Sequence, residues 1–189
     1  MKRTVVIVAV VVGVAFAAAY SNRGWVYKKR AFVYAVTGEL DRAIADFDEA
    51  IRLNPNYADA YADRGVTFAR KGELDRSIAD LDEAIRLNPK NALVYYNRGG
   101  VYGRKGELDR SIADFDEAIR LDPKDADTYR NRGLAYNSKG SYDLAIVDFN
   151  EAIRLDPKNA VFYTNRGNVY NRKGDYDQGN RVNSLVTSD

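Results

Sequence analysis

The chain has 189 residues, enough for one ordinary domain, and a formal net charge of +2 from 29 Lys and Arg against 27 Asp and Glu. Lys2 and Arg3 are the only charged residues before Ser21, so acids and bases balance from there onward, without the basic patch or stripe of a nucleic-acid-binding protein. The chain has no Cys and no His, which excludes thiol nucleophiles, disulfides and imidazole bases, and we expect no metal, no cofactor and no nucleic-acid partner.

The first element in chain order is an apolar segment, residues 1–20, for which we expect one helix. Lys2 and Arg3 precede Val5–Ala19, an unbroken run of apolar or small residues. This pattern fits a secretory signal, with A-x-A cleavage sites within Ala15–Ala19, and also a membrane anchor, because the run meets the lower limit of roughly 17–25 residues for a spanning helix. Basic residues follow the run as well as precede it, so charge does not fix its orientation. The segment therefore predicts a chain held in the membrane by its N-terminus, or exported if residues 1–20 are cleaved.

Small residues within this segment recur every four positions, at Ala9, Gly13 and Ala17. On a helix they share one face and would permit close helix–helix packing. A homodimer through this face is therefore one expected assembly.

The rest of the chain repeats with a period of 34 residues. The stretch 72–90 differs from 106–124 at two positions only, which establishes internal duplication. The recurring positions are Gly65, Gly99, Gly133 and Gly167; Pro55, Pro89, Pro123 and Pro157; and Gly38, Gly72, Gly106, Gly140 and Gly174.

Each repeat is predicted to form two helices. In the third repeat, apolar residues at helical spacing run to about Arg104, where Lys105-Gly106 ends the first helix. Asp109 is the expected N-cap of a second helix, which Asp122-Pro123 ends because the residue before proline disfavours helix.

An aromatic residue, then Gly, Tyr, Ala, Phe, Ala and Pro at fixed spacing resembles the tetratricopeptide repeat. The fourth repeat has the complete set: Tyr129, Gly133, Tyr136, Ala145, Phe149, Ala152 and Pro157. The resemblance implies an all-α fold, a right-handed α-solenoid of antiparallel helix pairs, and a scaffold that binds a protein or peptide partner. The units are predicted at 24–57, 58–91, 92–125 and 126–159, followed by a partial, degenerate repeat and tail at 160–189.

The pattern fails in that last unit. Gly179, Asn183 and Val186 stand where Ala, Phe and Ala are expected. We expect the helix from about Ala160 to Arg172 to close the array.

An arginine on each first helix precedes an aspartate on the second helix by sixteen residues. Antiparallel packing would bring each pair together, and we predict a ladder of ion pairs within or between hairpins, against the alternative that both groups face solvent. The pairs are Arg30 and Asp46, Arg64 and Asp80, Arg98 and Asp114, and Arg132 and Asp148.

The second helices are near copies, whereas the first helices diverge, as a surface that presents different groups along its length would. In the resembling family the first helices line a concave groove, and three asparagines recur at one groove position, where their amides would hydrogen-bond an extended peptide. The predicted protein-binding residues are Trp25, Lys28, Lys29, Asp63, Tyr96, Asn97, Arg130, Asn131, Thr164 and Asn165.

The clamp by which some family members hold a chaperone carboxylate is not matched, since Asp127 stands where a base is required. The repeated carboxylates at Asp80, Asp82 and Glu83 are expected on an exposed helix stripe, and repetition does not supply the single pocket that catalysis needs, so we predict that the chain is not an enzyme.

The sequence thus predicts an envelope-associated interaction scaffold. Two alternatives stay open: a structural protein that self-associates through its apolar N-terminus and its open C-terminal end, and a non-catalytic accessory to envelope glycan enzymes with Tyr96 and Trp25 stacking on sugars.

Overall fold

The structure, a computed structural model, describes residues 23–175 and residue 178. The predicted helix at residues 1–20 and the break of the repeat at Gly179, Asn183 and Val186 lie outside the described residues. The described residues form helices joined by short turns, with no strand among them. The all-α class is therefore confirmed.

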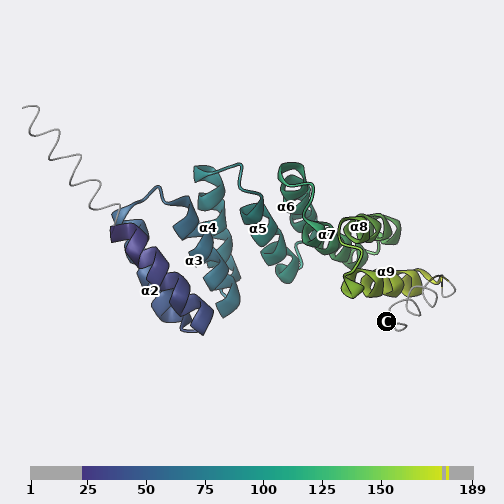
Figure 1. The fold of residues 1–189 in the computed structure, drawn as a ribbon, viewed down its shortest axis with the longest axis horizontal. Helices are drawn as coiled ribbons and strands as arrows, with labels where there is room; N and C mark the ends of the chain where they lie inside the picture. Colours follow the sequence, from purple (N-terminus) through teal and green to yellow (C-terminus); the bar gives the residue numbers. More distant parts are fainter. Residues whose placement is uncertain (1–22, 176–177, 179–189) are drawn as a thin grey trace, which may run out of the picture. The chain divides into compact units, whose positions relative to one another are not determined.

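The chain divides into two compact units, Met1–Pro89 and Lys90–Asp189, each a stack of helix hairpins. The first contains a helix at residues 23–37, then α2 (Leu40–Leu53), α3 (Ala58–Lys71) and α4 (Leu74–Leu87). The second contains α5 (Ala92–Lys105), α6 (Leu108–Leu121), α7 (Ala126–Ser138), α8 (Tyr142–Leu155) and α9 (Ala160–Lys173) (Figure 1). The predicted repeat boundaries and the right-handed turn of the solenoid stay predictions.

The turn inside each hairpin depends on glycine. Gly72 has φ +86°, a left-handed conformation that L side chains rarely adopt. Its N–H donates to the Ala69 carbonyl at 3.1 Å, and the Glu73 N–H donates to the Phe68 carbonyl at 3.0 Å, which satisfies the last carbonyls of α3. Gly38, Gly106, Gly140 and Gly174 have the same left-handed conformation.

The predicted cap of the second helix in the third repeat is wrong. α6 begins at Leu108, its N-cap is Glu107, and Asp109 lies in the first turn. The tight turn at Gly106 lets the helix begin directly after Glu107, so Asp109 lies inside the helix and cannot cap it. The Asp109 carboxylate instead forms an ion pair with Lys139.

The two helices of a hairpin are antiparallel and packed closely. A Cβ placed on Gly99 of α5 would lie 3.0 Å from Cε1 of Phe115 on α6, whereas one on Gly103 would lie 3.3 Å from Oγ of Ser111. The later residue of α5 thus contacts the earlier residue of α6, which is the pattern of antiparallel helices. Phe115 is 2% exposed, and each buried Phe of this kind stabilises the hairpin by roughly 1.5–3 kcal/mol.

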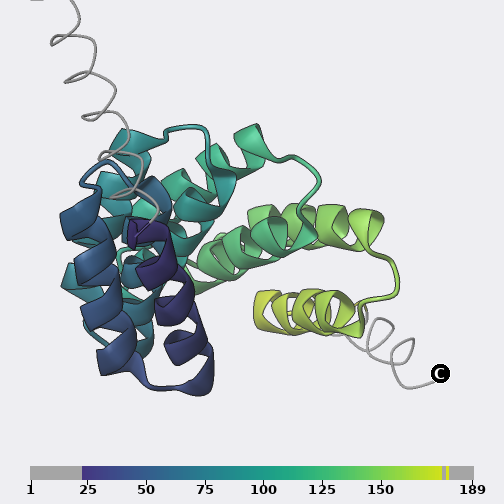
Figure 2. The same ribbon diagram turned by 60° about the vertical axis from the view of Figure 1, so that its left-hand side comes forward.

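Successive hairpins pack side by side within each unit, as α8 and α9 do in Figure 2. In residues 23–175 and 178, no helix combines the length and the apolar character needed to cross a membrane.

Candidate functional site

The predicted ladder of ion pairs is present in each complete hairpin. In the fourth, Arg132 of α7 donates from Nε to Oδ2 of Asp148 at 2.9 Å and from Nη2 to Oδ1 at 2.6 Å. Such two-point pairing fixes both side chains. The prediction that these groups form ion pairs within hairpins is confirmed, with Arg30 on Asp46, Arg64 on Asp80, and Arg98 on Asp114 in the same geometry.

Two of these arginines, Arg64 and Arg132, also reach back to the preceding hairpin of their unit. Nη1 of Arg132 donates to Asp116 of α6 at 2.5 Å, and Nη1 of Arg64 donates to Asp48 of α2 at 2.5 Å. One guanidinium therefore joins a first helix to the second helices on either side of it. These aspartates also recur every 34 residues, which is the signal that would have found them.

A second set of ion pairs was not predicted. Lys71 binds Asp41 at 2.6 Å and Lys173 binds Asp143 at 2.5 Å, each lysine at the end of a first helix and each aspartate thirty residues earlier. Lys139 and Asp109 form the same pair. Since each aspartate is largely exposed, these pairs contribute little to stability.

The predicted exposed stripe of carboxylates is only partly correct. Asp80 is 6% exposed, because it faces Arg64 between the helices, whereas the Glu83 side chain reaches solvent and pairs with Arg86. The period of the second helix turns every third or fourth residue inward, and Asp80 falls on that inward face.

In the first unit, predicted groove residues neutralise one another. Nζ of Lys28 lies 3.2 Å from Asp63 and 3.8 Å from Asp59, and it also lies over the Tyr57 ring. Burial raises the pKa of the Asp63 carboxyl, although Lys28 opposes this. The structure thus brings Lys28 and Asp63 together across the first helix and α3.

Trp25 and Lys29 of the first helix lie together away from that pair. Nζ of Lys29 lies 5.6 Å from the centre of the Trp25 ring. The Trp25 side chain is 51% exposed, and Val26, Phe32, Val33 and Val36 of the same helix are 55–66% exposed. These five apolar side chains fall within one face of the helix, which we call the first-helix apolar face.

In the second unit, the first helices α5 and α7 line a hollow of about 290 Å³. Part of its wall on α5 is bare because Gly100 and Gly103 carry no side chain, and a Cβ on Gly100 would meet nothing within 4 Å. The corresponding residues of α7 are Leu134 and Asn137. The lining also contains Arg104, Leu108, Ser111, Phe115, Asn131, Leu134, Ala135 and Ser138. We call this space the glycine hollow.

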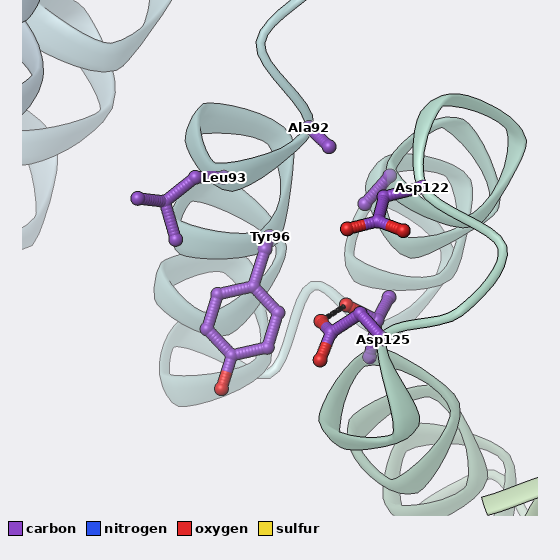
Figure 3. A pocket seen from close by; sticks show the side chains of 7 residues that line it. Ala92, Leu93, Tyr96, Asp122 and Asp125 are labelled. Carbon is purple, nitrogen blue, oxygen red and sulfur yellow. Dashed lines mark hydrogen bonds between the residues drawn. The ribbon is translucent and has the colours of Figure 1, made fainter. Parts of the chain in front are cut away.

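A second hollow of about 230 Å³ lies at the other end of α5 (Figure 3). Tyr96 forms one wall and packs on Phe115 with ring centres 6.1 Å apart. Asp122 and Asp125 lie opposite, and Asp125 accepts a hydrogen bond from Thr128. We call this space the acidic hollow. It has an aromatic wall and a negative rim, which suits a cationic side chain.

The structure distributes the other predicted groove residues differently. Arg130 pairs with Asp127 at 3.3 Å on its own helix, and the Thr164 hydroxyl donates to the Ala160 carbonyl. Asn97 is half-buried on α5, and Nδ2 of Asn165 is buried with no hydrogen-bond acceptor among the residues that the structure describes. Of the three repeated asparagines, Asn131 is the one that lines either of these two hollows.

Gly100 and Gly103, which line the glycine hollow, are not among the predicted protein-binding residues. A glycine adds no group that can be recognised, so a search for polar or aromatic groove residues passes over it. The available signal was that Phe32, Val66, Leu134 and Asn168 occupy the position of Gly100 in the other repeats. No group of three or more acidic, His or Cys side chains suited to a metal ion occurs in the part of the chain that the structure describes.

Repeated antiparallel hairpins, with arginines joining successive pairs and first helices lining hollows, define an α-helical repeat protein. The chain belongs to the tetratricopeptide-repeat family: the family described as TPR repeat matches residues 33–72, 67–106, 104–139 and 133–174, which together exceed half of the chain. The resemblance seen in the sequence is thereby confirmed, and with it the helical-repeat scaffold. A search among curated proteins gave no match.

Solved structures share this fold. The crystal structure of MamA protein superposes with a TM-score of 0.80 at 25% identity, over 87% of this chain and 90% of that one. MamA from Desulfovibrio magneticus RS-1 gives 0.81 at 21% identity, over 87% and 93%. YrrB, described as a TPR protein with an unusual peptide-binding site, gives 0.72 at 22% identity, over 85% and 82%.

Proposed function

We propose that the chain is a non-catalytic scaffold whose α5–α7 groove binds an extended peptide of a partner protein. The observation that carries the proposal is the glycine hollow, where Gly100 and Gly103 leave the groove wall bare. At about 290 Å³ and 230 Å³ the two hollows lie at or under the lower end of the roughly 300–1,000 Å³ range of small-molecule and cofactor sites, and this size suits single side chains of a peptide.

The lining indicates the peptide's chemistry. Leu108, Phe115 and Leu134 give the glycine hollow an apolar wall that suits an aliphatic or aromatic side chain, and polar groups, among them Arg104, complete its lining. The acidic hollow suits a Lys or Arg against Tyr96, Asp122 and Asp125. The peptide-binding site named for YrrB supports a peptide ligand on this fold.

The test begins with selection of peptides from a random display library on the full-length chain in mild detergent. Selected peptides are then measured by fluorescence anisotropy. We expect apolar and basic residues to be enriched, and Gly100→Phe, whose Cβ would meet no atom within 4 Å and whose ring would occupy the hollow, to weaken binding at least tenfold. Ala113→Phe on the exposed side of α6 is the matched control and should bind normally. Equal binding by Gly100→Phe and the control would refute the site.

The role of the asparagines is tested separately. Changing Asn97, Asn131 and Asn165 together to Ala should weaken the selected peptides if these amides hydrogen-bond the peptide backbone. Because Asn131 lines the glycine hollow, Asn131→Ala alone should account for most of the loss. A loss confined to Asn97→Ala or Asn165→Ala would contradict this assignment.

We propose further that the chain is associated with the cell envelope. Support comes from the apolar sequence of residues 1–20 and from the first-helix apolar face, which begins five residues later and contains Trp25, a residue that favours membrane interfaces. After cell lysis, the chain should sediment with membranes and resist extraction at alkaline pH. N-terminal sequencing would distinguish an anchor from a cleaved signal, and intact chain in the soluble fraction would refute the proposal.

Self-association is a second candidate function, and the first-helix apolar face favours it too. A second copy of the chain would shield Trp25, Phe32 and Val36 from water just as lipid would. Light scattering of the detergent-solubilised chain distinguishes self-association from membrane association alone. A dimer that becomes a monomer in Phe32→Glu supports self-association, whereas a monomer at all concentrations excludes it.

A further inference from the structure

The acidic hollow and the glycine hollow lie along one groove between α5 and α7. On α5, Tyr96 lines the acidic hollow, and Gly103, seven residues later, lines the glycine hollow. On α7, Thr128 and Ala135 line the same two hollows with the same offset. Seven residues are close to two helical turns, so the hollows share one face of each helix and lie about 10.5 Å apart along it.

Between the two hollows the groove is aromatic. Tyr96 is half-buried and forms a wall of the acidic hollow (Figure 3). Its ring packs on Phe115, which lines the glycine hollow, with ring centres 6.1 Å apart. A peptide that fills both hollows must therefore pass over Tyr96.

The separation of the hollows selects the conformation of such a peptide. In a β-strand, side chains on one face are two or four residues apart, which is about 6.7 or 13.4 Å. In the polyproline II helix, side chains three residues apart share a face and are about 9.3 Å apart. Since the hollows are about 10.5 Å apart along the helices, polyproline II is the better match. Aromatic-lined grooves are also the surfaces that bind this conformation in other proteins.

The acidic hollow selects a basic side chain. Asp122 and Asp125 accept hydrogen bonds from backbone N–H groups of their own turn, and Asp125 also accepts one from Thr128. Neither carboxylate has a cationic partner within residues 23–175 and 178. The pairs at the corresponding positions of the other turns are Asn54 and Tyr57, Asn88 and Asn91, and Asp156 and Asn159. The third repeat therefore combines two acids in this turn with the two glycines of α5.

We propose, on the basis of the peptide-binding groove proposed above, that its ligand is a proline-rich segment in the polyproline II conformation, with a Lys or Arg three residues from an aliphatic or aromatic residue. The basic side chain lies against Tyr96, beside Asp122 and Asp125, and the apolar side chain fills the glycine hollow. The residues between them pass over Tyr96. Proline suits these positions because its ring presets the backbone φ of polyproline II, which needs no internal hydrogen bond.

The spacing is tested with fluorescent peptides of one composition and the full-length chain in mild detergent. Lys-Pro-Leu-Pro-Pro, Lys-Pro-Pro-Leu-Pro and Lys-Pro-Pro-Pro-Leu place Lys and Leu two, three and four residues apart. Each is also made in reverse order, because the hollows set a spacing and not a chain direction. In the tighter-binding direction, anisotropy should show the spacing of three binding about fivefold or more tightly than the others. Glycine in place of each proline should weaken binding, since a flexible chain loses more entropy when it is ordered.

The charge is tested by substituting residues that already stand in an equivalent turn. Asp122→Asn with Asp125→Asn gives the pair found at Asn88 and Asn91, and the Asn91 side chain caps α5 as Asp125 caps α7. This double variant should weaken the Lys peptide about five- to tenfold and leave a peptide with Gln in place of Lys nearly unchanged. Asp156→Asn, in the turn between α8 and α9, is the matched control and should bind normally.

The outcomes separate this ligand from the groove itself. No binding by any peptide of the series, equal binding at the three spacings, or equal binding by the proline and glycine versions would overturn the polyproline II ligand, and the groove would stand if Gly100→Phe still weakened library-selected peptides. If Gly100→Phe affected neither those peptides nor the spacing-of-three peptide, the groove would be refuted and this ligand with it. Unchanged binding of the Lys peptide to the double variant would overturn the assignment of the basic residue to the acidic hollow.

Discussion

Arg64 and Asp80 form a two-point ion pair across the second hairpin, with Nε and Nη2 of the arginine each 2.7 Å from an oxygen of the aspartate. The pair is largely shielded from water, since the two side chains are only 17% and 9% exposed. The position of Arg64 between α2 and α4 makes this pair a junction between hairpins as well as within one.

Removing one partner of this pair should destabilise the first unit. Asp80→Ala leaves a half-buried guanidinium with Asp48 as its remaining acceptor, and we expect a loss of about 1.5–3 kcal/mol in the free energy of unfolding, in the range of hydrogen bonds to charged groups. Urea unfolding followed by circular dichroism measures it. Glu83→Ala, which removes an exposed pair with Arg86 on the same helix, is the control and should change stability far less. Equal losses in both variants would show that the Arg64 pair has no special role.

The ladder also shows what the sequence could and could not predict. The sixteen-residue spacing of Arg64 and Asp80 was sufficient because both lie in one hairpin, whose two helices are antiparallel and joined by a fixed glycine turn. The pairing of Lys71 with Asp41 depends on how one hairpin packs against the next, and a spacing of thirty residues carries no local signal for that.

The candidate site was less predictable than the fold. Lys28 and Asp63 were both assigned to the groove, but their mutual ion pair depends on side-chain directions that a list of positions does not contain. The glycine hollow arises from missing side chains at Gly100 and Gly103, and its size depends on the depth at which Phe115 and Leu134 pack around it.

The exposed glutamates of the second helices should make stability depend on acid pH. Glu49, Glu83, Glu117 and Glu151 each accept hydrogen bonds from an arginine three residues later, and this lowers the pKa of each carboxyl below its ordinary value of 4.5. A carboxyl with a lowered pKa in the folded state stabilises the fold above its unfolded pKa, and this contribution is lost as the pH falls through the folded pKa.

Replacing all four glutamates by Gln tests this directly. The variant should melt below wild type at pH 7, and the difference in melting temperature should shrink and vanish as the pH falls below about 4.5. Melting curves from pH 7 to pH 3 measure it. A difference that is constant across this range would show that the ion pairs do not contribute.

Two adjacent glycines of α5 should respond oppositely to alanine. At Gly99 the added Cβ would lie 3.0 Å from the Phe115 ring and 3.1 Å from the Ser111 carbonyl, so we expect Gly99→Ala to destabilise by about 1–3 kcal/mol. At Gly100 it meets nothing within 4 Å, so Gly100→Ala should stabilise by about 0.5–1 kcal/mol through helix propensity. Thermal unfolding compares the two, and shifts of the same sign would contradict the packing described here.

Two serines at equivalent positions of α4 and α6 should also differ. Both are buried, but the Ser111 hydroxyl donates to the Gly99 carbonyl at 2.8 Å, whereas the Ser77 hydroxyl has no hydrogen-bond partner within residues 23–175 and 178. Ala43 and Ala145 occupy the same position in the other repeats, so alanine fits the site. Changing Ser to Ala raises helix propensity equally in both variants, and the difference between them therefore isolates the hydrogen bond.

Ser77→Ala should raise the free energy of unfolding because it removes an unpaired buried hydroxyl, which costs about 1–3 kcal/mol. Ser111→Ala should gain less or lose stability, since it removes a hydrogen bond that contributes about 0.5–1.5 kcal/mol. Urea unfolding of both single variants and of the double variant measures the gap. If Ser111→Ala stabilised the chain as much as Ser77→Ala, the bond to Gly99 would contribute nothing, and the two hairpins would be equivalent in energy despite their different hydrogen bonding.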